Sequence, residues 1–243
     1  MNKIIWILWD SGYDKSPPIC KACVRSWKQK NVGWKIIFLD YQNITKYIPV
    51  TEFNKILQFN SKTTQSDLIR LYLVGRFGGL YTDITNYCNI PLDVWLRESI
   101  LVDGYWLHFD YDSTLPTFNF IYVNNNKHIF YNIYKTIIDD KELHDGEFLR
   151  IIKRFHSLMP SNMNKLKNNQ IGKSSNNTTP KQGTKIIAND FRLMNEPHDS
   201  TFDSALKVYP FFKLTYKKVP GGELNNVFNS DSKVLKLISR KHE

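Results

Sequence analysis

The sequence has no long apolar run, few cysteines and no internal repeat. Its first apolar run, Ile4 to Trp9, is too short for the hydrophobic region of a signal peptide. It is also far short of the ~20 apolar residues that cross a bilayer, and no other segment approaches that length. We therefore expect a soluble, cytoplasmic protein with at most peripheral membrane contact.

The scarcity of cysteine limits redox and zinc chemistry. Only Cys20, Cys23 and Cys88 are present. The Cys20-x-x-Cys23 spacing suits a redox pair or half a zinc site, but no second CxxC or histidine pair at ligand spacing completes it. Cys23 shares a helical face with Ile19 and Trp27, which favours a place in the core. A small, odd cysteine count also fits a reducing compartment.

Positive charge and aromatic residues are in excess. The 243 residues include 33 Lys and Arg against 23 Asp and Glu, a formal charge of +10, and 14% are aromatic. Such a charge attracts anions, including nucleic acid, acidic lipids and phosphorylated substrates. Because the lysines are scattered and no aromatic-and-basic RNA-binding module is present, we expect no nucleic-acid partner. The length and the 42% hydrophobic content fit one globular domain.

The order of apolar patterns predicts an α/β fold with a mostly parallel sheet flanked by helices. Two buried strands, Ile4 to Trp9 and Trp34 to Leu39, enclose a helix that opens at Pro17-Pro18 and runs toward Lys30. A helix from Thr64 to Phe77 should end at Gly78-Gly79 and lead directly into a strand. Further strands are expected at 80–82, 99–102, 105–109 and 118–123, and further helices at 127–138 and 146–158.

Composition also divides the single expected domain, residues 1–243. Residues 159–184 are rich in Asn, Ser, Lys and Thr, which predicts a mobile polar loop or an insertion. Residues 185–243 form a smaller closing segment that carries the apolar run Val208 to Tyr216.

The segment that carries chemistry is Ser66-Asp-Leu-Ile-Arg70, followed by Gly78-Gly-Leu-Tyr-Thr-Asp83-Ile-Thr85. On a helix, Asp67 and Arg70 are three residues apart and share a face. The glycine pair then turns the chain into a strand that ends at Asp83. Open α/β sheets bind ligands beyond the carboxyl ends of their strands, so the three side chains should meet at one edge. An ion pair within the helix plus an incidental turn aspartate is the alternative, and spacing alone leaves both open.

These residue types suit a sugar diphosphate. A carboxylate at a strand end can hold Mg²⁺ or Mn²⁺, which neutralises a leaving diphosphate. Asp67 can accept hydrogen bonds from sugar hydroxyls, and Arg70 can donate to oxygen atoms or orient Asp67.

The same motif resembles the donor-site signature of capsular polysaccharide synthesis glycosyltransferases. It is similar as well to that of glycosyltransferase family 32, which includes fungal initiating mannosyltransferases, and to that of the clostridial glucosylating toxins. The resemblance covers about residues 3–135 and extends to four further stretches: Ile4 to Gly12, Pro17-Pro18, Ser26-Trp27 and Phe118-Asn119.

The resemblance implies a GT-A (Rossmann-like) fold with a donor core at 1–135 and an acceptor side at 185–243. It implies retaining transfer from a UDP- or GDP-sugar to a glycan or lipid-linked glycan, assisted by Mn²⁺ or Mg²⁺. The implied catalytic residues are Asp67, Arg70 and Asp83, and the implied donor-binding residues are Leu8, Trp9, Gly79, Tyr81 and Asn119. In some relatives a ring at the position of Trp9 stacks on the base; a core tryptophan closing the first strand is the alternative.

One departure from the family pattern concerns the metal. The DXD motif of many relatives is Asp83-Ile-Thr85 here, so the implied metal ligands are Asp83 and Thr85, and a hydroxyl is a weaker ligand for a hard cation than a carboxylate. A third ligand would come from the C-terminal part, where Glu223, Asp231 and His198 are candidates. The departure would permit an inactive nucleotide- or sugar-binding module. A second alternative is a basic enzyme associated with nucleic acid that uses Asp83 for a metal.

Overall fold

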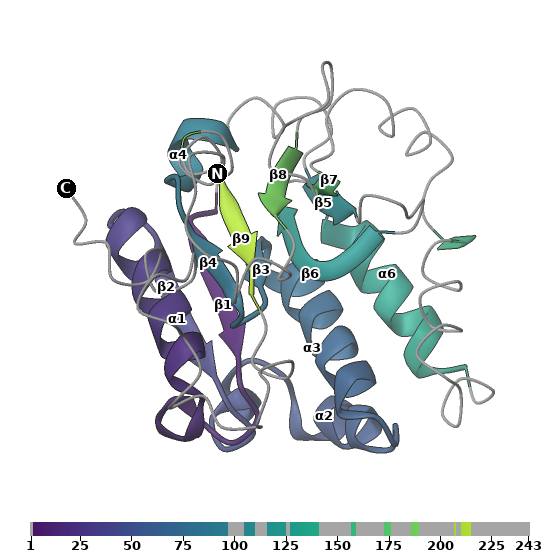
Figure 1. Cartoon of the computed structure of the whole chain (residues 1–243). Helices are drawn as coiled ribbons and strands as arrows, with labels where there is room; N and C mark the ends of the chain where they lie inside the picture. Colours follow the sequence, from purple (N-terminus) through teal and green to yellow (C-terminus); the bar gives the residue numbers. More distant parts are fainter. Residues whose placement is uncertain are drawn as a thin grey trace.

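The computed structural model describes residues 2–96, 105–109, 116–124, 127–140, 157–158, 173–175, 186–189, 207 and 210–214. These residues form helices around one mixed sheet (Figure 1). The strands are β1 (Ile4–Leu8), β2 (Lys35–Leu39), β3 (Gly79–Thr82), β4 (Asn86–Cys88), β5 (Tyr105–Phe109), β6 (Pro116–Val123), β7 (Lys173–Ser175), β8 (Ile186–Asn189) and β9 (Phe211–Lys213). The helices are α1 (Pro18–Lys30), α2 (Val50–Leu57), α3 (Lys62–Phe77), α4 (Leu92–Trp95) and α6 (Lys127–Ile138), with 3₁₀ turns at Tyr13–Lys15 and Ile44–Lys46.

The sheet has the strand order β2-β1-β3-β6-β5-β7-β8-β9-β4. β1 pairs in parallel with β2 and β3, whereas β6 runs antiparallel between β3 and β5. β7 and β8 continue in parallel, and the sheet closes with the antiparallel pair β9 and β4. Most pairings of the described strands are therefore parallel, which confirms the predicted α/β class with a mostly parallel sheet flanked by helices.

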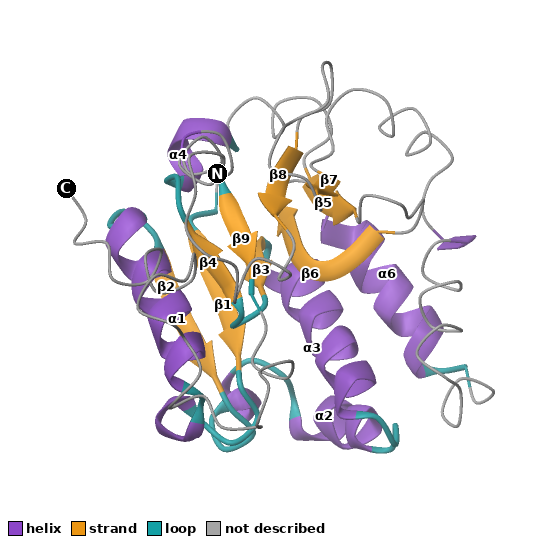
Figure 2. Ribbon diagram, viewed as in Figure 1, coloured by secondary structure: helices purple, strands orange, loops and turns teal. Residues whose placement is uncertain are grey.

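One face of the sheet packs against α1 (Figure 2). Ile5 and Ile7 of β1 point to this face, where they meet Cys23 and Trp27 of α1. The indole Nε1 of Trp27 donates a hydrogen bond to the Asn86 carbonyl over 2.7 Å, which ties α1 to β4. The predicted core position of Cys23 is confirmed. Cys20, Cys23 and Cys88 are all buried free thiols whose pKa is raised by burial.

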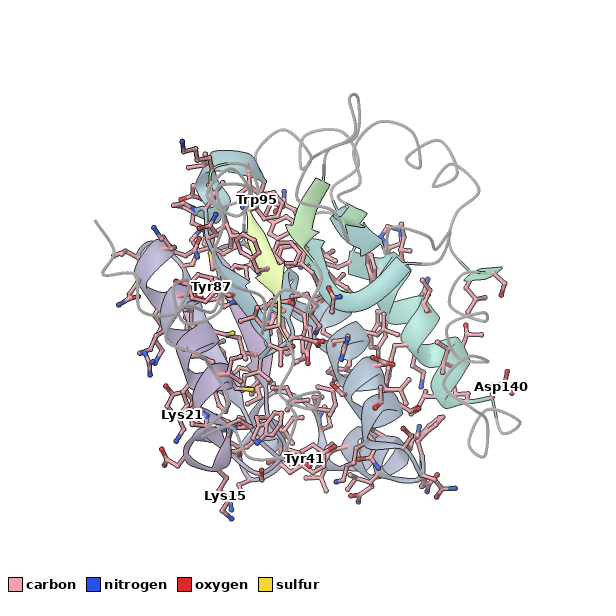
Figure 3. The ribbon with its side chains drawn as sticks, viewed as in Figure 1. Lys15, Lys21, Tyr41, Tyr87, Trp95 and Asp140 are labelled. Carbon is pink, nitrogen blue, oxygen red and sulfur yellow. The ribbon has the colours of Figure 1, made fainter. Side chains whose placement is uncertain are left out.

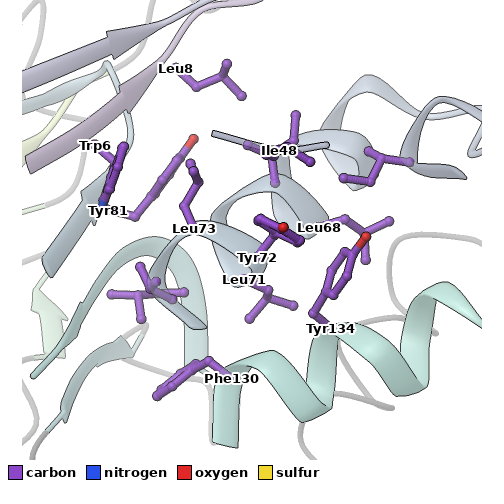
Figure 4. Close-up of a cluster of buried hydrophobic side chains, with 14 of the residues drawn as sticks. Trp6, Leu8, Ile48, Leu68, Leu71, Tyr72, Leu73, Tyr81, Phe130 and Tyr134 are labelled. Atoms are coloured by element: carbon purple, nitrogen blue, oxygen red, sulfur yellow. The ribbon is translucent and has the colours of Figure 1, made fainter. Parts of the chain in front are cut away.

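The opposite face packs against α2, α3 and α6, because side chains alternate along a strand. Trp6 of β1 lies here, and its indole Nε1 donates to the Gly78 carbonyl over 2.9 Å. Figure 4 shows side chains of β1 and β3 meeting those of α3 and α6: Trp6, Leu8, Leu68, Leu71, Tyr72, Leu73, Tyr81, Phe130 and Tyr134. None of the helices in the described part of the chain is long and apolar enough to cross a membrane.

The predicted elements lie close to their expected bounds. The helices expected from Pro18 to Lys30 and over 127–138 are found there, and the helix expected from Thr64 begins two residues earlier, at Lys62. The first strand ends at Leu8, so Trp9 lies just beyond it. The strand expected at 99–102 and most of the helix expected at 146–158 lie outside the described residues.

Several short elements were not predicted. They are α2, α4, β4, β8 and β9. Residues 173–175, within the stretch predicted as a polar loop, form β7 and pair with β5 and β8. The division into a donor core and an acceptor-side segment stays a prediction.

We expect Gly75→Ala to destabilise the protein by about 1–3 kcal/mol, because it overpacks the contact between α3 and α6. A Cβ at Gly75 would lie 2.5 Å from the backbone nitrogen and 2.8 Å from the Cα of Tyr131, and backbone atoms cannot swing aside. At Gly33 the nearest atom is the Lys3 Nζ, 4.0 Å away, so Gly33→Ala is a matched control with a change of about 0.5 kcal/mol or less. Urea unfolding measures both; equal stabilities would contradict the close packing.

Candidate functional site

The carboxyl ends of β1, β2 and β3 lie at one edge of the sheet, because these strands are parallel neighbours. Figure 3 shows Lys15, Lys21 and Tyr41 at this end of the molecule, on the loops and helix start that follow β1 and β2. Leu8 is buried in the core, whereas Trp9 is partly exposed. The backbone N–H of Trp9 donates to the Leu39 carbonyl over 3.0 Å, which fixes the end of β1 beside β2.

Helix α3 presents Asp67 and Arg70 from its middle turns. The helix begins after Ser61, whose hydroxyl caps the Thr64 N–H, and ends at Gly78, whose φ of 71° suits a residue without a Cβ. The Arg70 Nη2 lies 3.2 Å from the Asp67 Oδ1, and both side chains are almost fully buried, as the shared helical face predicts.

Further contacts hold the guanidinium of Arg70 in place. Its Nη2 donates to the Ser66 hydroxyl over 2.9 Å and its Nε donates to the Ser66 carbonyl over 3.2 Å. The guanidinium also lies over the ring of Tyr81, with Cζ 4.7 Å from the ring centroid. Arg70 is therefore fixed between α3 and β3 rather than swinging into solvent.

Asp83 follows directly after β3 and is held by a tight turn. Its N–H donates to the Asn119 carbonyl over 2.8 Å, and its carbonyl accepts from the Asn86 N–H over 3.0 Å. The Asp83 Oδ1 lies 3.3 Å from the Arg70 Nη2. Arg70 thus bridges Asp67 and Asp83, and the structure brings together the three side chains that the motif predicted.

A fourth charged residue, Lys213, completes this cluster and was not predicted as part of it. Strand β9 pairs with β4 so that Lys213 lies opposite Asn86. The Lys213 Nζ donates to the Asp83 Oδ2 over 2.6 Å and to the Thr85 hydroxyl over 2.9 Å. The sequence feature that could have pointed to Lys213 is its position as the one lysine within the apolar run Val208 to Tyr216.

The two carboxylates of the cluster differ in their pKa. Burial raises the pKa of Asp67 to about 7, although Arg70 opposes this, and the Asp83 charge adds to the increase. Burial also acts to raise the pKa of Asp83, but Lys213 and Arg70 outweigh it and hold that pKa below its usual value. Near neutral pH, Asp83 is ionised, whereas Asp67 is partly protonated.

The Asp67 Oδ2 is buried and has no hydrogen-bond partner in the described part of the chain. A buried, unpaired carboxylate oxygen is costly, because its interaction with water is lost without replacement.

Two further predicted donor-binding residues, Tyr81 and Asn119, contact the cluster, whereas Gly79 lies at the other end of β3. Tyr81 is buried in the core, with its hydroxyl 3.4 Å from the Ser66 hydroxyl. Gly79 has a φ of 87°, and a Cβ there would lie 2.6 Å from the Ile4 carbonyl oxygen, so strand packing requires a glycine. Asn119 is partly exposed and contributes its carbonyl to the Asp83 turn. Their roles toward a donor stay predictions.

The predicted metal ligands do not fit a divalent cation in this arrangement. Magnesium and manganese sites are built from several oxygen ligands, with carboxylates supplying most of the charge. Asp83 is the only carboxylate of the predicted pair, and Lys213 already contacts both Asp83 and Thr85. The described residues contain no group of three or more His, Cys, Asp or Glu that could hold a metal. The candidate third ligands Glu223, Asp231 and His198 lie outside those residues.

Comparison with protein families gives one match: the family described as capsular polysaccharide synthesis protein matches residues 1–230. The comparison with curated proteins gives no match. Solved structures with a similar chain path include the galactosyltransferase LgtC in complex with donor and acceptor sugar analogues, with 10% identity, 97% of this chain and 95% of that chain covered, and a TM-score of 0.48.

Two other structures have comparable values. A glycosyltransferase involved in glycosylation of the major capsid of PBCV-1 is 11% identical, covers 86% of this chain and 92% of its own, and has a TM-score of 0.48. The PaToxG glycosyltransferase is 14% identical, covers 69% of this chain and 73% of its own, and has a TM-score of 0.47.

Proposed function

The chain belongs to the capsular polysaccharide synthesis protein family, a glycosyltransferase-like family, and we propose that it transfers a hexosyl unit from a UDP- or GDP-sugar to a glycan or lipid-linked glycan. The family resemblance of the sequence is thereby confirmed. The donor, the acceptor and the stereochemistry are parts of the proposal.

One observation carries the proposal. Asp67, Arg70 and Asp83 converge beside the carboxyl end of β3, with ion pairs of 3.2 and 3.3 Å, and the buried Asp67 Oδ2 has no partner among the described residues. A cluster that served only stability would be expected to satisfy that oxygen, because buried polar atoms in native proteins are nearly always paired. Sugar hydroxyls are donors of the required kind.

Each residue has a role in this proposal. The Asp67 Oδ2 accepts a hydrogen bond from a sugar hydroxyl, and Arg70 holds the two carboxylates at their spacing. Arg70 and Lys213 supply positive charge near the leaving diphosphate, where charge develops during transfer. No step runs through a metal ion. Trp9, partly exposed at the end of β1, provides a ring surface for the base. The family resemblance implies retention of configuration at the anomeric carbon.

Release of UDP or GDP from a panel of UDP- and GDP-hexoses tests the function. We expect one sugar nucleotide to be hydrolysed above background, with faster release when a glycan acceptor is added. Lys135→Ala is a matched control, because Lys135 of α6 forms a surface ion pair with Asp139, the residue after the helix. It should leave nucleotide release unchanged.

Other outcomes would favour the rival functions. Nucleotide binding without any release from the whole panel would indicate a binding module. Cleavage or tight binding of nucleic acid with no response to sugar nucleotides would indicate the nucleic-acid-associated enzyme. Retention would be checked by NMR of the anomeric proton of the transferred sugar.

We further propose that residues 1–135 bind the donor and residues 185–243 contribute to the acceptor side.

A further inference from the structure

The ammonium of Lys213 contacts the two side-chain oxygens, of Asp83 and Thr85, that the family pattern implies as metal ligands. Its Nζ is 2.6 Å from the Asp83 Oδ2 and 2.9 Å from the Thr85 hydroxyl oxygen. A cation bound by both oxygens would have to lie between them, where the ammonium already is. The ammonium carries a positive charge of its own, so it is a chemical substitute as well as an obstacle.

The position of Lys213 is held by its strand. Phe211 and Phe212 before it and Leu214 after it are all buried, and Phe211 stacks on Phe120 with ring centroids 4.7 Å apart. The Leu214 N–H donates to the Thr85 carbonyl over 2.9 Å. Because these three neighbouring side chains are buried, the backbone of Lys213 has little freedom to move away from Asp83.

The carboxylate of Asp83 already has two cations beside it. The Arg70 Nη2 lies 3.3 Å from the Asp83 Oδ1, and the Lys213 Nζ lies 2.6 Å from the Asp83 Oδ2. A divalent ion at Asp83 would add two positive charges beside two existing ones, which is unfavourable at such distances. A bound diphosphate, in contrast, would add negative charge beside the cations.

The ammonium also has a donor left to offer. A lysine ammonium has three N–H groups, and within the described ranges Asp83 and Thr85 accept two of them. The Lys213 side chain is partly exposed, at 23%, so the third N–H can reach a ligand that arrives from solvent.

We propose that the Lys213 ammonium takes the place of a divalent cation in donor binding, holding Asp83 and Thr85 while it donates to an oxygen of the donor diphosphate. This inference rests on the proposed nucleotide-sugar donor. It adds that the enzyme binds and uses that donor without a metal. It also adds that Thr85, at the position of the second acid of the DXD motif, accepts a hydrogen bond from Lys213 instead of binding a metal ion.

Calorimetric titration of UDP and GDP in excess EDTA tests the inference. Wild-type protein is expected to bind one of the two nucleotides in EDTA with an affinity within about threefold of that in Mn²⁺, since the metal adds no ligand contact there. Lys213→Met, which keeps an unbranched side chain of similar size and removes the charge, should weaken binding in EDTA about 10- to 100-fold. Lys213→Arg should lose less, and Lys135→Ala should bind as wild type does.

Metal binding gives a readout independent of activity. Titration of Mn²⁺ followed by electron paramagnetic resonance should show no binding to wild-type protein beyond that of the free nucleotide. In Lys213→Met, Asp83 and Thr85 are released, and nucleotide-dependent Mn²⁺ binding should appear. Thermal melting of each variant confirms that it is folded; if Lys213→Met is not, the wild-type comparison and Lys213→Arg still decide.

The outcomes separate this inference from the proposed function. Nucleotide binding by the wild-type protein only when Mn²⁺ is present would overturn the inference and leave the glycosyltransferase proposal intact. Unchanged nucleotide affinity of folded Lys213→Met in EDTA would also overturn it. Failure to bind either UDP or GDP with or without Mn²⁺ would remove the donor assignment itself, and the inference with it.

Discussion

Replacing Asp83 with asparagine is expected to lower turnover of the sugar nucleotide on the order of 100- to 1,000-fold, as the loss of one fixed electrostatic group at a reacting centre does. Asp83 holds Arg70 at 3.3 Å and Lys213 at 2.6 Å, so its charge positions both cations. Asparagine keeps the size of the side chain but removes that charge. The measurement is steady-state release of UDP or GDP.

The same substitution should have a modest effect on stability. The Asp83 side chain is 25% exposed, so its ion pairs are partly screened by water, and a loss of about 1–2 kcal/mol is expected in urea unfolding. Asp93→Asn is a matched control, because Asp93 pairs with Lys3 over 2.8 Å at a surface position on α4. It should leave turnover unchanged. Wild-type turnover in Asp83→Asn would exclude Asp83 from the catalytic machinery.

Replacing Arg70 with methionine is expected to destabilise the protein by about 3–5 kcal/mol, because removing one partner of a buried ion pair leaves the other uncompensated. Arg70 lies between Asp67 and Asp83, and its side chain is 7% exposed. Nucleotide release should be lost as well. Arg76→Met tests the same change on the same helix, at an exposed arginine that contacts the Tyr131 ring, and should cost less than about 1 kcal/mol.

The cost of Arg70→Met should depend on pH through Asp67. In the wild-type protein, burial raises the pKa of Asp67 from 3.8 to about 7, so between these values the folded state holds a proton that the unfolded chain has released. Its contribution to stability therefore falls as pH rises through this window. Without Arg70 the carboxyl keeps its proton to a still higher pH, because the attraction to the guanidinium is gone.

The stability difference between wild-type protein and Arg70→Met should consequently grow as pH rises above about 7. Urea unfolding of both proteins at about pH 6 and about pH 8 measures this difference, with Arg76→Met giving the same value at both. A difference that shrinks with rising pH, or a cost near that of Arg76→Met, would contradict the buried bridge.

Long elements with a regular pattern were predictable, whereas short ones were not. Helix α3 has mostly buried side chains from Thr64 to Gly75 and a glycine pair at its end, so its existence and its exit into β3 could be predicted. Helix α2 has eight residues and only two buried ones, Phe53 and Ile56, which is too few to show a periodicity. Strands β4 and β9 have three residues each, and neither has an alternation of its own.

The candidate site follows the same division. Asp67 and Arg70 are one turn apart on α3, and Asp83 follows the next strand. Spacing showed that the three could converge, and the family resemblance favoured this over an incidental turn aspartate. The sequence could not predict the partly exposed position of Trp9 or the packing demand on Gly79, because each depends on a neighbouring strand. The metal prediction relied on the motif of Asp83 and Thr85 alone. It did not include strand β9, whose Lys213 contacts both residues.

The sequence by itself determined the α/β class and the shared edge of Asp67, Arg70 and Asp83, because helix periodicity, strand burial and a glycine turn act within a few residues. Only the tertiary structure decided that Lys213, 130 residues from Asp83, completes the cluster. Its place depends on the register between β4 and β9 and on the burial of Phe211, Phe212 and Leu214. Strand register is set by long-range packing, and a shift of one residue would turn Lys213 to the other face.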